Sequence, residues 1–226
     1  MSEAALPLAG ELPELAGVSW RARVDECALR RRDRRWTRWT VYHELPLLAT
    51  AAGMVVLSPL LAPMSVIALA FAWVIPSLYA ARGAGVMQTP TWVRPGGAPV
   101  GAVAEHRALG LLGDLVGHEP RAILRDTGFV VEPGRFGTWV VGPAGALLVR
   151  GPRGRRVQCW CVRASGEELP RADRIAHLLL ALRADEAGFA TVANLSFSGA
   201  RWRVRRRLAP DARTALAAAV GLMRRG

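Results

Sequence analysis

The chain has 226 residues, a formal net charge of +12 and 51% hydrophobic residues. All 30 basic residues are arginine, because the sequence contains no lysine. Schiff-base catalysis and P-loop nucleotide chemistry, which depend on a lysine amine, are therefore excluded in this chain. The three cysteines are an odd number in a chain that begins without a secretory signal, so we expect reduced thiols and no disulfide framework.

The N-terminal 44 residues change character near Trp20. Residues 1–19 are small and acidic and contain two prolines, which predicts a poorly ordered tail. Residues 20–44 are basic and aromatic, and Trp36, Trp39 and Tyr42 recur at a spacing of three. This spacing places them near one face of a helix beside a membrane.

Residues 45–81 contain no charged side chain and are too numerous for one ordinary membrane span. Pro59 and Pro63 lie near the middle of this stretch, where proline favours a chain reversal. We therefore predict a hairpin of two helices, residues 45–62 and 64–81, each about 27 Å long beside a hydrocarbon core of about 30 Å. Spanning and re-entrant arrangements both remain open, and a buried helical pair in a soluble domain is the weaker alternative.

Arginines flank this hairpin on both sides and are absent from its turn. Short basic segments resist translocation, so we expect an inner-membrane protein with both termini in the cytoplasm. Aromatic residues near the two ends of the hairpin are candidates for an interfacial belt. Besides the three named above, these are Trp73, Tyr79 and Trp92.

Residues 82–99 are rich in glycine and proline and predict a linker. Residues 100–226 then predict a cytoplasmic α/β or α+β domain that is long enough to bury a core. The apolar pattern predicts helices at residues 101–116, 169–187 and from 210 onward, and strands at 122–131, 138–141, 146–150, 157–163, 190–197 and 201–208.

Three segments of this domain carry a resemblance to a known family. The runs GAVAEHRALGLLGDL, AILRD and GRFGTWVVGPAGALLVRG resemble the nuclease-related domain, across roughly residues 99–198. The resemblance implies a restriction-endonuclease-like fold. Gly137 stands where that family has its metal-binding aspartate, Arg150 where it has a glutamate, and Pro152 where it has a lysine.

Of the family's catalytic residues only Glu105 is retained, and it remains a weak candidate. One carboxylate cannot assemble a magnesium site, so we expect no catalytic centre, no metal and no cofactor. A polar residue on an exposed helix face is the simpler interpretation of Glu105. Cys159 and Cys161 flank Trp160 in a predicted strand, and we expect buried free thiols there.

Alternating arginines form the candidate binding surface. In a strand over residues 201–208, four arginines would share one face, and three more in a nearby loop would extend it. Anionic lipid or nucleic acid would bind such a surface, although a solvated edge strand is the simpler interpretation. These residues are Arg201, Arg203, Arg205, Arg207, Arg153, Arg155 and Arg156.

These features favour a non-enzymatic inner-membrane protein whose cytoplasmic domain serves binding or scaffolding. Its expected partners are membrane lipids and an unidentified protein or nucleic acid. Two alternatives stay open, namely a membrane-tethered nuclease and a module that binds nucleic acid or anionic lipid without catalysis.

Overall fold

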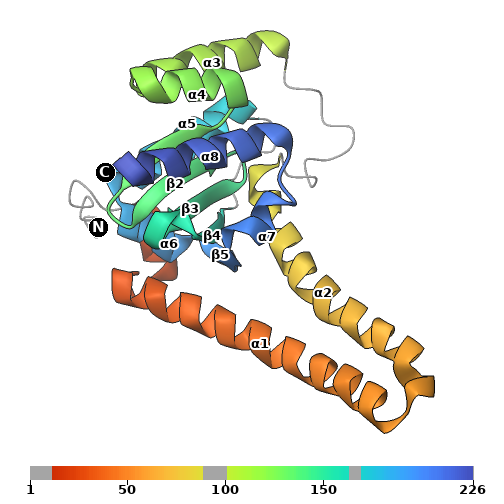
Figure 1. The fold of residues 1–226 in the computed structure, drawn as a ribbon. Helices are drawn as coiled ribbons and strands as arrows, with labels where there is room; N and C mark the ends of the chain where they lie inside the picture. Colours follow the sequence, from red (N-terminus) through yellow and green to blue (C-terminus); the bar gives the residue numbers. More distant parts are fainter. Residues whose placement is uncertain (1–11, 89–100, 163–168, 226) are drawn as a thin grey trace.

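A five-stranded antiparallel sheet forms the centre of the computed structural model, which describes residues 12–88, 101–162 and 169–225. The strands lie in chain order, each paired with the next. Helices cover both faces of the sheet, and two long helices project away from it (Figure 1). The strands are β1 (Val130–Gly134), β2 (Gly137–Gly142), β3 (Gly145–Arg150), β4 (Arg156–Cys161) and β5 (Asn194–Ala200).

One core lies beneath the helices that cover the first face of the sheet. Trp139 and Trp160 are fully buried there, and Phe189 packs edge-on against Trp139 with 5.6 Å between ring centroids. The 3-10 helix Pro13–Val18 contacts this layer, so part of the segment expected to be a disordered tail is folded. The helices are α3 (Ala102–Leu115), α5 (Arg171–Ala184) and α6 (Glu186–Val192).

A second core lies on the opposite face, because side chains alternate along each strand. Val140 and Leu147 point to this side and are fully buried. Ala212, Ala215, Leu216 and other residues of α8 pack against them. The covering helices are α7 (Arg201–Arg205) and α8 (Pro210–Arg225). α4 (His118–Thr127) contacts β1 and α8, with Leu124 in the first core and Ile123 against the second.

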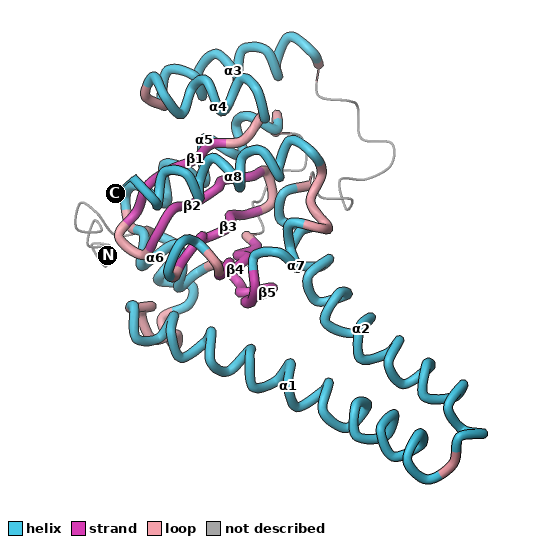
Figure 2. The backbone as a smooth tube through the Cα atoms, viewed as in Figure 1, coloured by secondary structure: helices cyan, strands magenta, loops and turns pink. Residues whose placement is uncertain are grey.

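Two long helices form the projecting hairpin and join it to the sheet. α1 (Glu26–Leu57) is continuous, so the expected juxtamembrane helix and the first hairpin helix are one element. α2 (Ala62–Ala84) returns from the hairpin turn to the sheet. The N-terminal part of α1 packs on the edge strand β5 (Figure 2). Leu29 joins the first core, and Trp36 packs against the second. A helix over an edge strand prevents pairing with other chains.

The fold is of the α+β kind, since every strand pair is antiparallel. The helix expected at residues 101–116, the strands expected at 138–141 and 146–150, and the C-terminal helix from Pro210 are confirmed. The strand expected at 157–163 is present as β4 over its described part. The helix expected at 169–187 instead breaks at Asp185, whose carboxylate accepts a hydrogen bond from Gly188 N and begins α6. The strand expected at 190–197 begins later, as β5.

Two strand predictions are wrong. Most of the expected strand 122–131 is helix α4, which begins after Gly117 and ends at Gly128, a residue in the left-handed conformation that terminates helices. Residues 201–208 form α7 and a turn, because Val204 and Leu208 are both buried in the second core. Their spacing of four is helical, and it outweighs the alternation of arginines.

The expected linker of residues 82–99 is also wrong in its first part. α2 continues to Ala84, and Val86 and Met87 of the following 3-10 helix are buried in the second core. A β-carbon on Gly83 would collide with the side chains of Phe197 and Cys159, so α2 meets the sheet at close range. The rest of the expected linker, which includes Trp92 and Arg94, lies outside the described residues.

Candidate functional site: the base of the helical hairpin

The outer part of the hairpin is apolar and exposed. α1 and residues 62–87 are each long and apolar enough to cross a membrane, judged by length and composition alone. Only 6% and 17% of their most apolar windows are buried, whereas the core helix of a soluble protein is mostly buried. Leu57 and Leu60 at the turn are 84% and 89% exposed. A hydrophobic surface of this extent indicates an apolar partner.

Three helices meet where the hairpin joins the domain, and we call this junction the hairpin base. Glu44 on α1 accepts a hydrogen bond from Arg203 on α7 at 3.2 Å. Trp202 on α7 lies beside Trp73 on α2, with 6.3 Å between ring centroids. The guanidinium of Arg206 lies over both indoles, 5.0 and 5.9 Å from their centroids, which is a favourable cation–π distance.

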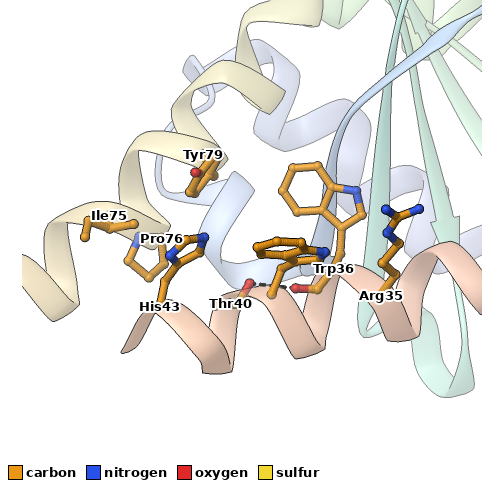
Figure 3. Close-up of a pocket in the computed structure, with 8 residues that line it drawn as sticks. Arg35, Trp36, Thr40, His43, Ile75, Pro76 and Tyr79 are labelled. Atoms are coloured by element: carbon orange, nitrogen blue, oxygen red, sulfur yellow. Dashed lines mark hydrogen bonds between the residues drawn. The ribbon is translucent and has the colours of Figure 1, made fainter. Parts of the chain in front are cut away.

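An aromatic cleft of about 390 Å³ lies between α1 and α2 at the hairpin base. Trp36, His43 and Tyr79 line it, and Trp36 contacts Tyr79 edge to face with 5.9 Å between ring centroids (Figure 3). Thr40 donates a hydrogen bond to the Trp36 carbonyl at 2.9 Å, so its hydroxyl is satisfied within the helix. Rings with one polar end are the side chains that favour a membrane–water interface.

A row of arginines continues along the outer face of α1 from this cleft. Trp39 and Tyr42 extend the row toward the apolar part of the helix, and both are exposed. Opposite them on the same helix, Leu29 and Asp33 face the sheet. The arginines are Arg31, Arg34, Arg35 and Arg38, all exposed.

The seven arginines expected to form one binding surface are divided in the structure. The helical geometry of α7 directs Arg203 to Glu44 and leaves Arg205 and Arg207 exposed. Burial, together with the charges of Arg224 and Arg205, lowers the pKa of Arg201. The single strand face expected for Arg201, Arg203, Arg205 and Arg207 is therefore wrong.

The loop arginines also separate. Arg153 and Arg155 are exposed, and the Arg155 carbonyl accepts a hydrogen bond from Arg201 N at 2.9 Å, which places these two chain segments side by side. Arg156 instead turns to α1, where it donates a hydrogen bond to Thr37 Oγ1 at 3.0 Å. Only part of the expected extension therefore joins the arginines of α7.

Glu105 has a structural role in this fold. Its carboxylate accepts hydrogen bonds from Arg171 N at 2.8 Å and Ala172 N at 3.2 Å, which are the first residues of α5. A carboxylate at a helix N-terminus satisfies unpaired N–H groups and the helix dipole. Glu186, the first residue of α6, accepts a hydrogen bond from Phe136 N. Arg150 donates to the carbonyl of that same Phe136, so this contact of Arg150 lies near the start of α6 and those of Glu105 lie at the start of α5.

The resemblance would align three further positions with catalytic residues of the nuclease-related domain, and these hold Gly137, Arg150 and Pro152. Gly137 has φ of 147°, and a β-carbon there would collide with the Val149 carbonyl oxygen, so this backbone does not accommodate an aspartate. Pro152 begins an exposed 3-10 turn. Among the described residues, no group of three or more histidine, cysteine, aspartate or glutamate side chains is placed to hold a metal ion.

Arg150 belongs to a polar network beneath α1. Its guanidinium lies 3.7 Å from Asp33 Oδ2 and 3.6 Å from Glu26 Oε1. Burial lowers the pKa of Arg150, and the charges of Asp33 and Glu26 oppose that effect. Asp33 also accepts hydrogen bonds from Gln158 and Ser198, on the adjacent strands β4 and β5. The network attaches α1 to the sheet.

The cysteines agree with the expectation of free thiols. Cys159 is buried in the second core, and Cys161 is half-buried, and burial raises the pKa of both thiols. Cys27 near the start of α1 is exposed. Cys27 is therefore the most accessible of the three thiols.

Comparison of the chain with protein-family models, with curated proteins and with solved structures found no match. The resemblance to the nuclease-related domain therefore remains an expectation.

Sequence reasoning missed Asp33, Trp202 and Arg206. Asp33 lies among arginines on α1, and its partners Gln158 and Ser198 are 125 and 165 residues away along the chain, so no local pattern indicates the network. The helical spacing of Val204 and Leu208 is the signal that would have placed Trp202 and Arg206 correctly.

Proposed function

We propose that this chain is a membrane-anchored protein whose hairpin inserts into a lipid bilayer and holds a binding or scaffolding domain at the cytoplasmic surface. The observation that carries the proposal is the exposed apolar surface of the hairpin, together with arginines and aromatic rings at its base. In water this exposed apolar surface would promote aggregation, whereas in a bilayer it would face the lipid chains.

The orientation follows from charge. Arg31, Arg34, Arg35 and Arg38 on α1 and Arg82 on α2 lie on the base side, and no charged residue lies between Leu45 and Ala81. The positive-inside rule therefore assigns the domain and both termini to the cytoplasmic side of the inner membrane. The proposed direct partners are anionic membrane lipids, each nearby arginine contributing about 1 kcal/mol to the attraction.

Flotation of the purified full chain with phospholipid vesicles tests the anchor. We expect the protein to float with the vesicles and to remain bound in high salt and alkaline carbonate, because apolar insertion is not screened by salt. The variant Leu57→Asp/Leu60→Asp should lose this resistance, whereas Leu109→Asp, on exposed α3 away from the hairpin, should retain it. Release of the unaltered protein by salt alone would contradict the anchor.

A membrane-tethered nuclease is the alternative activity, and the role of Glu105 in α5 counts against it. A time course on plasmid and single-stranded DNA and RNA, with magnesium or manganese and then with chelator, tests it. We expect no metal-dependent cleavage. Cleavage that disappears in Glu105→Gln, while the fold is retained, would establish the nuclease.

Binding of nucleic acid without catalysis is supported by the exposed arginines of α1. Such binding would occur equally with chelator present and would weaken steeply with salt, because it releases condensed counterions. Competition between RNA and anionic vesicles for the full chain separates the two partners. We expect vesicles to displace RNA, since only lipid also engages the hairpin.

A further inference from the structure

The part of the hairpin that projects beyond its base is short. On α1 it extends from Leu45, which follows the paired Glu44, to Leu57, which is 13 residues or about 20 Å at 1.5 Å per residue. On α2 the charge-free stretch continues to Ala81, but only the 11 residues 62–72 precede Trp73, which packs against Trp202 at the hairpin base, and they measure about 17 Å. A hydrocarbon core is about 30 Å thick, so neither arm reaches across it from the hairpin base.

The hairpin base sets where the water-facing part of the molecule begins. The ion pair of Glu44 with Arg203 and the packing of Trp202 on Trp73 hold α7 beside both arms at this level. Deeper insertion would carry Glu44, Arg203 and Arg206 into hydrocarbon, where charged groups are costly. The end of α2 is not available for insertion either, because Ala80 and Ala84 are buried in the second core.

The turn of the hairpin lacks the residues that mark a second interface. Trp36, Trp39, Tyr42, Trp73, Tyr79 and Trp202 all lie at or near the hairpin base. No tryptophan, tyrosine or charged residue occurs between Leu45 and Ala72. A hairpin that crossed the bilayer would be expected to carry an aromatic belt on both sides, whereas residues 12–88 place these rings on the base side only.

The backbone of the turn is also suited to hydrocarbon. Ser58 N donates a hydrogen bond to the Met54 carbonyl at 3.2 Å, and Leu61 N donates to the Ser58 carbonyl at 3.0 Å. Pro59 and Pro63 have no N–H group. Ser65 Oγ donates to the Ala62 carbonyl at 2.6 Å. Satisfied or absent donors lower the cost of placing a turn inside a membrane.

We propose that the hairpin enters one leaflet of an anionic phospholipid membrane and ends within the bilayer, with the arginines and aromatic rings of its base at the headgroups. This inference rests on the proposed function and specifies its interaction surface. Neither tilting nor bilayer thinning favours a full crossing. Tilting would shorten the depth that both arms reach. Thinning would have to remove about a third of the hydrocarbon core, and each ångström of mismatch between helix length and core thickness costs free energy.

Depth measurements on a fluorophore at the turn test the inference. The full chain, with Cys27→Ser and Cys161→Ser, receives Leu60→Cys and is labelled with a nitrobenzoxadiazole probe. It is reconstituted in phosphatidylcholine–phosphatidylglycerol vesicles. Dithionite is added before and after the vesicles are made permeable, and lipids with spin labels at shallow or deep acyl positions are compared. The matched control carries the probe on native Cys27, with Cys161→Ser.

We expect the Leu60 probe to be protected from dithionite both before and after permeabilisation, and quenched more by deep than by shallow spin labels. The Cys27 probe should be reduced. Protection of the Leu60 probe that is lost on permeabilisation would overturn the single-leaflet inference and leave the anchor intact. Full reduction in intact vesicles, with no quenching by either lipid, would overturn the inference and the proposed function together.

Binding to oil droplets coated with the same phospholipids is an independent measurement, because a monolayer has no second leaflet to cross. A hairpin that enters one leaflet should bind droplets as extensively as vesicles. Leu57→Asp/Leu60→Asp should lose binding to both. Binding to vesicles with none to droplets would overturn the inference.

Discussion

At the scale of single residues, Asp33 connects the projecting helix to the sheet. It is one of few acidic residues on α1, and its carboxylate faces a buried arginine and two side chains on adjacent strands. A buried charge whose partner is removed is strongly destabilising, because water cannot replace the lost interaction. Asp33 therefore supplies the charged part of the contact between α1 and the sheet, beside the apolar packing of Leu29 and Trp36.

Replacement of Asp33 by alanine should lower the free energy of unfolding by about 3 kcal/mol, because Gln158, Ser198 and Arg150 lose a buried partner. Asp33→Asn, which keeps one acceptor oxygen, should cost less. Denaturant unfolding in mild detergent, followed by tryptophan fluorescence, measures both. Asp126→Ala, at an exposed residue of α4, serves as the control. An Asp33→Ala variant as stable as this control would contradict the network's role.

Glu105 allows a second test at this scale. Glu105→Ala should destabilise the protein by about 1 kcal/mol, the usual effect of losing a side chain that caps a helix. Glu105→Gln retains an acceptor and should have a smaller effect. Thermal unfolding monitored by circular dichroism compares the stability of the unaltered protein with that of Glu105→Gln and Glu105→Ala. Equal stability of all three would show that the carboxylate is not needed as a cap.

At the scale of elements, α1 and α2 belong both to the hairpin and to the domain. The sequence places a boundary near residue 100, yet residues before it fill both cores. Val24 and Leu29 are buried in the first core, and Ala80, Ala84, Val86 and Met87 in the second. The sheet cannot bury both faces without them, so the expected independent domain of residues 100–226 is incomplete.

A fragment of residues 100–226 should therefore fail to fold cooperatively, because Trp160, Cys159 and Phe197 would lose apolar cover. The full chain in mild detergent should show a cooperative thermal transition. Near-ultraviolet circular dichroism, which reports packed aromatic rings, compares the two. A fragment with the transition of the full chain would show that the domain ends where the sequence pattern suggests.

At the scale of the whole molecule, the exposed arginines lie at different distances from the projecting hairpin. α3 and α4 lie on the side of the sheet away from the projecting hairpin (Figure 1). The arginine row lies on α1 beside the hairpin base. Arginines near the hairpin should therefore contribute to lipid binding, and arginines on α3 and α4 should not.

Arg34→Gln/Arg38→Gln should weaken binding to anionic vesicles by about 2 kcal/mol, or roughly 30-fold, at about 1 kcal/mol per arginine. Binding to neutral vesicles should be unchanged. Arg107→Gln/Arg125→Gln, on α3 and α4, is the matched control with the same change in charge. Sedimentation with vesicles at low and moderate salt measures the affinities. Equal losses in the two double variants would indicate a net-charge effect without a specific surface.

The sequence by itself determined the features that depend on local composition and period. The charge-free stretch, its proline turn, the strands at β2, β3 and β4 and the helix α8 all follow from side-chain type and spacing, which act over a few residues. These properties need no knowledge of the distant chain.

Only the tertiary structure decided where the hairpin ends and what the arginines contact. Trp73, Glu44 and Arg203 come from three helices, and their meeting at the hairpin base depends on α7 packing Val204 and Leu208 into the second core. That packing makes residues 201–205 a helix despite their alternating pattern, since burial of two apolar side chains outweighs local preference. Burial of Ala80 and Ala84 in the second core takes the last turns of α2 into the domain, so the arm beyond the hairpin base is short.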